Sequence, residues 1–178
     1  MSKTVPEAAS TLDREREAVL EVLAEQRSFL RHTLQGLDQD QATTRTTASE
    51  LTLVGLVKHL SSVERGWMDF IEQGEDLEAD QASPEAVERH ERTFRLVGEE
   101  TLESVLADYD RAARETEEYV RSLTDLEREH QLAPAPWVEG EIFWSARKVL
   151  LHLIRETSQH CGHADIIREA LDGQKTMG

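Results

Sequence analysis

Apolar residues recur every three or four positions along most of this chain, the spacing of helices that bury one face. Charged and polar residues fill the positions between them, so the opposite faces are expected to meet solvent. The pattern predicts four long helices, at about residues 12–36, 49–73, 101–123 and 145–171. Ser10 or Thr11 is suited to cap the first helix. Three glycines are suited to end helices: Gly36, Gly74 and Gly173.

The segments between these helices are irregular. We expect residues 1–9 to be frayed and residues 38–47 to form a polar, threonine-rich loop. Residues 74–98 are acidic and too many for a tight turn, which predicts a long crossover with one short helical turn. Residues 130–140 hold Pro134 and Pro136, which prevent a regular helix. No alternation typical of strands is present, so the prediction is a single all-α domain, residues 1–178, folded as a four-helix bundle with long crossover connections.

Composition narrows the range of partners. The net charge of −16 argues against nucleic acid and against anionic membrane surfaces, because both require basic patches. No apolar run approaches the roughly 20 residues of a membrane span, and the first residues lack the apolar core of a signal peptide. A single cysteine cannot form an internal disulfide. These features predict a cytoplasmic protein.

The last predicted helix carries ionisable residues on its apolar face. On a helical wheel, Glu156 and His160 fall on this face, one turn apart. His59 lies on the shoulder of the apolar face of the second predicted helix. A buried carboxylate is costly unless it is paired or bound to a metal. We therefore predict that His59, Glu156 and His160 meet in the bundle core and bind a divalent metal.

Two histidines and one glutamate form the ligand set of open catalytic zinc sites, which keep one position for water or substrate. Zinc is the expected metal, and nickel, iron or manganese would suit the same ligands. A structural interpretation stands beside this one. His59 alone could be a packing residue, and Glu156 could pair with Arg147 or Arg155.

The remaining candidates receive lesser roles. His163 follows His160 by one turn and is expected to act as a second-shell partner, a fourth ligand or a residue of the substrate cleft. His152 is interpreted as a packing or surface residue, and Cys161 as a small core thiol. Three tryptophans could wall a pocket, Trp67, Trp137 and Trp144, although Trp67 is more simply interpreted as a core residue. Three other histidines are expected to be solvated: His32, His90 and His130.

Two segments resemble the DinB-like superfamily, and more closely its mini-circle (DUF664) branch. They read LTLVGLVKHLSSVERGW, from Leu51 to Trp67, and HLIRETSQHCGHADIIRE, from His152 to Glu169. The resemblance extends over nearly the whole chain and implies a four-helix bundle with a divalent metal at one end of its core. By position, His59, Glu156 and His160 match the ligands of the similar mycothiol-dependent maleylpyruvate isomerase, although its C-terminal sterol-carrier-like domain has no counterpart here. The resemblance also implies a homodimer.

The function expected from the residues and the resemblance is that of a metal-dependent S-transferase or isomerase. It would use a low-molecular-weight thiol, mycothiol or bacillithiol, to attack an electrophile. One alternative is a non-catalytic, stress-related bundle that binds metal. Another is a metal-dependent hydrolase, in which Glu64 or Glu156 could act as the base only if it is not a ligand.

Overall fold

The computed structural model describes residues 10–74, 83–132 and 140–176, so the expected fraying of residues 1–9 lies outside the described residues. The elements are α1 (Thr11–Leu34), α2 (Gln39–Thr43), α3 (Leu53–Gln73), α4 (Pro84–Thr93), α5 (Leu102–Ser122), β1 (Glu129–Gln131), β2 (Phe143–Ser145) and α6 (Ala146–Asp172). The predicted all-α bundle is confirmed. None of the helices in these ranges combines the length and apolarity needed to cross a membrane.

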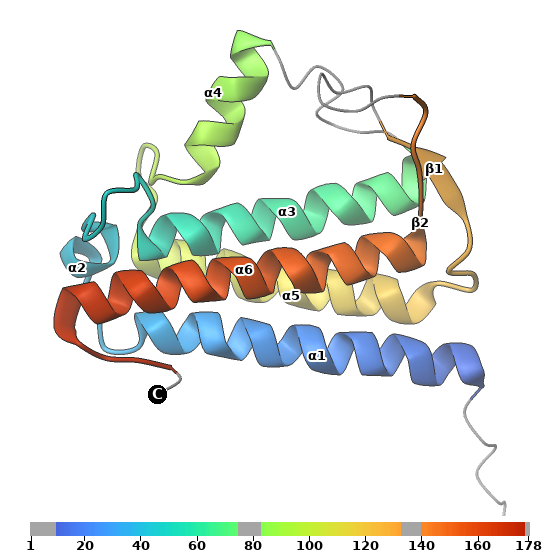
Figure 1. Ribbon diagram of the computed structural model, residues 1–178, viewed down its shortest axis with the longest axis horizontal. Coiled ribbons are helices and arrows are strands. Elements are labelled where there is room, and N and C mark those ends of the chain that lie inside the picture. The colour runs from blue at the N-terminus through green and yellow to red at the C-terminus, as the bar shows by residue number, and fades with distance from the viewer. Residues whose placement is uncertain (1–9, 75–82, 133–139, 177–178) are drawn as a thin grey trace, which may run out of the picture.

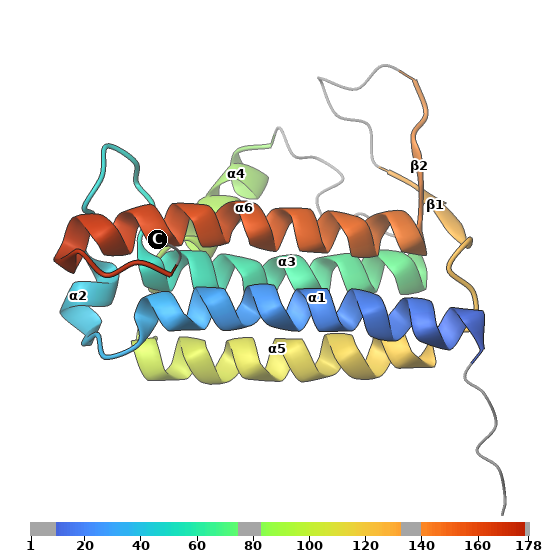
Figure 2. The same ribbon diagram turned by 60° about the horizontal axis from the view of Figure 1, so that its bottom comes forward.

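The four long helices α1, α3, α5 and α6 lie side by side along the long axis of the molecule (Figures 1 and 2). α1 and α6 run in one direction, and α3 and α5 run in the other. α1 packs mainly on α6, α3 packs mainly on α5, and the antiparallel pair α3 and α6 is the next largest contact. Because α3 and α5 are parallel, the chain between them must return along the bundle, as the crossover prediction requires. α4 lies within that connection.

The bundle core has an apolar cluster at each end and polar residues between them. One cluster centres on α3 residues such as Leu56 and Leu60, near α2. The other centres on residues such as Val149 and Leu153 of α6, near the β-strands. The buried polar side chains between the clusters include Arg27, Glu64, Thr116 and Thr157, and His59 is buried beside the first cluster.

The sequence-based boundaries were close for the long helices and wrong for the short elements. The first helix ends at Leu34, and α3 begins at Leu53 behind its N-cap Thr52 and not near Ser49. Residues 38–47 contain the short helix α2, which a capping box of Asp38 and Gln41 stabilises. α2 was missed because five residues are too few to show a helical period.

Two further corrections concern the connections. α4 has ten residues where one short turn was expected, and its start carries the signal that was overlooked: Ser83 caps it and Pro84 occupies its first position. β1 and β2 pair antiparallel, with His130 opposite Trp144. Strands of three residues show no readable alternation, so the pairing emerges only from the tertiary structure. Pro134 and Pro136 lie outside the described residues.

Candidate metal centre

His59, Glu156 and His160 meet between α3 and α6. Glu156 and His160 lie one turn apart on α6, and His59 faces them from α3. Oε1 of Glu156 is 3.3 Å from Nε2 of His160 and 3.8 Å from Nε2 of His59. One donor atom from each residue lies within 4.8 Å of the other two, so the group could hold a metal ion.

The three side chains are shielded but not sealed from solvent. The exposed fractions are 7% for the side chain of His59, 13% for His160 and 24% for Glu156. Burial lowers the pKa of His59 below its ordinary value, which favours the neutral imidazole. The neighbouring His160, and then His59, hold the pKa of the Glu156 carboxyl far below its usual range. A neutral imidazole and an ionised carboxylate are the forms that ligate metals.

The geometry suits a small divalent cation. Donors about 2.1 Å from a tetrahedral ion lie about 3.4 Å from one another, close to the two separations from Glu156. A carboxylate and two imidazoles also match the borderline donor preference of zinc and its neighbours. Three protein ligands leave a coordination position for a substrate atom. The residues present therefore fit a divalent metal ion.

The C-terminal end of α4 covers His59 on its outer side. The ring of Phe94 stacks on the His59 ring at 4.0 Å between centroids, with an interplanar angle of 19°. The ring of His90 meets it edge-on at 5.5 Å. The hydroxyl of Thr93 lies 3.1 Å from Nδ1 of His59. None of these contacts was predicted, because the sequence showed no long helical pattern here. His90, though exposed, belongs to this aromatic group and is not simply solvated.

His163 lies beside the group and is exposed. Its Nδ1 is 3.4 Å from Nδ1 of His160, on the side of that ring away from the contact with Glu156. This position is compatible with a hydrogen bond that orients the His160 ring. Among the described residues, the set of groups that could share a metal comprises His59, Glu156 and His160 without His163. Its role stays a prediction.

Aromatic residues flank the group toward the β-strand end of the bundle. Trp67 and Trp144 stack at 5.0 Å, and His152 meets both rings edge-on at 4.9 and 5.1 Å. His152 is therefore a packing residue, as one of its two interpretations predicted. Trp137 lies outside the described residues. His130 is half-buried, and its Nε2 donates to the carbonyl of Ile71, so the expectation that it is solvated was wrong.

Other reactive side chains in the core already form hydrogen bonds with neighbouring residues. Glu64 is fully buried, and both of its oxygens accept hydrogen bonds from Arg27. Cys161 lies against α1, its thiol donates to the carbonyl of Gln26, and burial raises the pKa of the thiol to about 11. Glu156 contacts neither Arg147 nor Arg155 in any described ion pair. Arg147 pairs with Glu15 and Glu127 instead.

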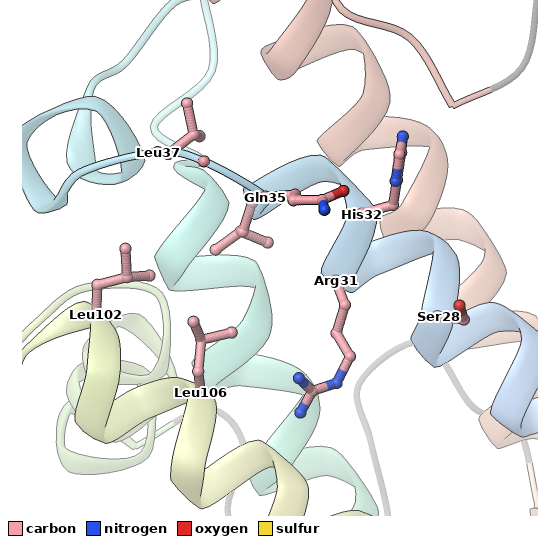
Figure 3. A pocket seen from close by; sticks show the side chains of 9 residues that line it. Ser28, Arg31, His32, Gln35, Leu37, Leu102 and Leu106 are labelled. Carbon is pink, nitrogen blue, oxygen red and sulfur yellow. The ribbon is translucent and has the colours of Figure 1, made fainter.

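A groove of about 530 Å³ lies elsewhere, between the end of α1 and the start of α5. Figure 3 shows Leu102 and Leu106 on one side of it and Arg31 and His32 on the other. None of the three candidate ligands lines this groove. It is therefore separate from the candidate metal centre.

The comparisons with known proteins agree with this architecture. No curated protein matches the chain. The sequence profile of the mycothiol-S-transferase family matches residues 18–173, from the first third of α1 to the residue that ends α6. The match includes all three candidate ligands and most of the chain. Both the fold and this match agree with the resemblance to the DinB-like superfamily, and the chain belongs to the mycothiol-S-transferase family.

Proposed function

We propose that this chain is a metal-dependent S-transferase that joins mycothiol to an electrophilic small molecule at His59, Glu156 and His160. The observation that carries the proposal is the convergence of two imidazoles and one carboxylate from α3 and α6. Membership of the mycothiol-S-transferase family supports the reaction class. A divalent metal bound there would supply positive charge that favours the thiolate form of a thiol at neutral pH.

The residues of this chain would bind the metal, orient its ligands and shield the site from water. Burial favours the neutral form of His59 and Glu156 is held ionised, so the group offers a lone pair and an anionic carboxylate to a cation. Phe94 covers one face of His59 and keeps water from that side. For a substrate with a leaving group, the new bond joins the thiol sulfur to carbon. The leaving group departs with its electron pair, and the thiol proton passes to solvent.

Two observations disfavour other reaction schemes. A raised thiol pKa makes Cys161 a poor nucleophile, so the external thiol supplies the reacting sulfur. The hydrolase alternative needs a carboxylate base besides the ligands. Glu64, the fully buried carboxylate of the described core, has both oxygens engaged by Arg27.

The proposal includes zinc as the resident metal, a homodimeric state and a cytoplasmic site of action. Zinc is supported by the ligand set, the dimer by exposed apolar residues on α1 and α6, and the compartment by thiol chemistry together with a single cysteine. Elemental analysis of the purified protein tests the first of these directly.

The decisive experiment measures the turnover of an electrophile with mycothiol, before and after the metal is removed with a chelator. The product is detected by its mass. His160→Ala should lower kcat/KM by about 100-fold or more, because a Lewis-acid contribution of several kcal/mol is lost. His32→Ala, an exposed histidine on α1, is the matched control and should retain activity. Equal rates with and without chelator would contradict metal dependence.

The same experiment separates the alternatives. Metal binding without turnover by any thiol would favour a non-catalytic metal-binding bundle. Product formation without a thiol would favour the hydrolase.

A further inference from the structure

The hydroxyl of Thr93 links the end of α4 to His59. Its oxygen donates to the carbonyl of His90 at 2.7 Å, one turn earlier in α4. The same oxygen lies 3.1 Å from Nδ1 of His59. A hydroxyl has a single proton to donate. With that proton directed to His90, the contact with Nδ1 must have the imidazole as donor and the hydroxyl as acceptor.

This assignment determines the tautomer of His59. If Nδ1 carries the proton, Nε2 of the neutral ring presents a lone pair. Nε2 is the atom that faces Glu156, at 3.8 Å from Oε1. A lone pair directed toward a carboxylate is unfavourable by itself and becomes favourable when a cation lies between them. We infer that Thr93 is a positioning residue, which holds His59 as the Nδ1–H tautomer with Nε2 ready to bind a metal.

The inference rests on the proposed metal centre and extends it to a segment outside the ligand helices. Figure 1 shows α4 rising away from the four long helices, with its C-terminal end nearest to α3. The contact with His59 is therefore made by the last turn of a helix that otherwise leaves the bundle. Other contacts must therefore hold the last turn of α4 in place if Thr93 is to keep its hydrogen bond with His59.

Two residues of α3 hold this turn against the bundle, and each lies about one helical turn or less from His59. A Cβ atom at Gly55 would lie 2.0 Å from the carbonyl oxygen of Phe94, so only glycine allows this close approach. Lys58 donates to the carbonyl of Arg95 at 3.0 Å and pairs with Glu100 at 2.6 Å. The helix that carries His59 thus also holds the segment that orients it.

The test measures metal affinity by competition with a chromophoric chelator, together with the ring ¹⁵N shifts of His59. Thr93→Val removes the hydroxyl at nearly constant volume and should weaken zinc binding by about 10- to 100-fold, the usual effect of losing an outer-sphere partner. Its His59 should shift toward the Nε2–H tautomer, because the Glu156 carboxylate then attracts the proton. Thr93→Ser keeps both hydrogen bonds and should bind zinc within about threefold of wild type.

Thr33→Val is the matched control. Thr33 also lies in the last turn of a helix, and its hydroxyl also donates three residues back, to Leu30, but it touches no candidate ligand. This variant should bind zinc like wild type. Gly55→Ala should weaken zinc binding as Thr93→Val does, although alanine favours a helix over glycine by about 1 kcal/mol.

Two outcomes would overturn the inference: wild-type zinc affinity in Thr93→Val, or an Nε2–H tautomer in the metal-free wild type. A wild-type protein that binds no metal would refute the proposed centre instead. The ¹⁵N shifts of the metal-free protein would then still decide whether Thr93 sets the tautomer.

Discussion

Glu64 is fully buried on α3, and both of its carboxylate oxygens accept hydrogen bonds from Arg27, at 2.6 and 2.9 Å. Arg27 is also buried, and it makes a further contact with the half-buried Glu117 at 3.1 Å. A two-point contact between a guanidinium and a carboxylate is both strong and directional. This pair lies in the polar middle of the bundle and links α1 to α3.

Replacing Glu64 by glutamine should destabilise the fold strongly. Removing the buried charge leaves Arg27 with the partly exposed Glu117 as its counter-charge, and losing one partner of a buried pair costs about 3–5 kcal/mol. Glu117→Gln is the matched control: it meets the same Arg27 but is 31% exposed, so its loss should cost about 1 kcal/mol or less. Urea denaturation measures both. Equal losses of unfolding free energy in the two variants would show that the buried Glu64 stabilises Arg27 no more than Glu117 does.

Cys161 should react slowly with alkylating agents. Burial raises its thiol pKa to about 11, so at pH 7 only about one thiol in 10,000 is ionised. Mass spectrometry after iodoacetamide treatment should show little modification of the folded protein and rapid modification in urea. Cys161→Ala should keep the proposed transferase activity. Loss of activity with an intact fold would show that the cysteine takes part in the reaction.

At the scale of elements, the end of α3 and the strand β1 support each other. Gly74 ends α3 in the left-handed conformation, with φ of 72°, and leaves room for the ring of His130. Nε2 of His130 donates to the carbonyl of Ile71, and Arg128 donates to the carbonyl of Glu72. The last carbonyls of the helix thus find partners in the chain around β1. Gly74 therefore has two functions, a left-handed cap and a close packing contact.

Gly74→Ala should cost more than Gly173→Ala. Both glycines end long helices with positive φ, so each alanine bears the left-handed penalty of about 1 kcal/mol. A Cβ atom at Gly74 would also lie 2.2 Å from Nδ1 of His130, whereas one at Gly173 meets nothing within 4 Å. We expect a loss of about 2 kcal/mol or more for Gly74→Ala by thermal unfolding. Adding His130→Ala should remove the excess, and a cost that persists would contradict this packing role.

At the scale of the whole molecule, the candidate metal centre joins α3 to α6, two helices far apart in the sequence. A metal that binds the folded state alone should stabilise it by about 2.7 kcal/mol at a concentration 100 times its dissociation constant. For a chain of this size, that corresponds to a rise of roughly 5–10 °C in Tm.

Scanning calorimetry with zinc and with a chelator measures this shift. His160→Ala should show no rise, and His32→Ala should respond like wild type. A rise of the same size in His160→Ala would place the metal at another site.

The quaternary state supplies a second prediction at this scale. Four of the large apolar residues that the described surface exposes lie on the adjacent helices α1 and α6: Val22, Phe29, Leu151 and Ile166. If these helices form the dimer contact, light scattering should give twice the monomer mass of 20.2 kDa. Phe29→Glu should reduce the mass to that of a monomer, whereas Val87→Glu on α4 should not. A monomeric wild type would contradict the proposed dimer.

The sequence by itself determined the long helices and the identity of the candidate ligands. The apolar period locates α1, α3, α5 and α6, since a helix that buries one face must repeat its apolar residues. Glu156 and His160 could be assigned to one face because a single helix sets their geometry. His59 required only that α3 and α6 pack together, which the bundle prediction contained. These features are encoded locally or follow from one packing assumption.

The tertiary structure alone decided what surrounds those ligands. Thr93, Phe94 and His90 reach His59 through a crossover whose path depends on contacts at Gly55 and Lys58, not on local periodicity. Likewise, Glu64 could be read as a possible base until Arg27 was found on both of its oxygens. Such partners come from distant segments, and pairing between distant segments leaves no repeat in a single sequence. The physical reason is that periodicity reports which face of a helix is buried, but not what it is buried against.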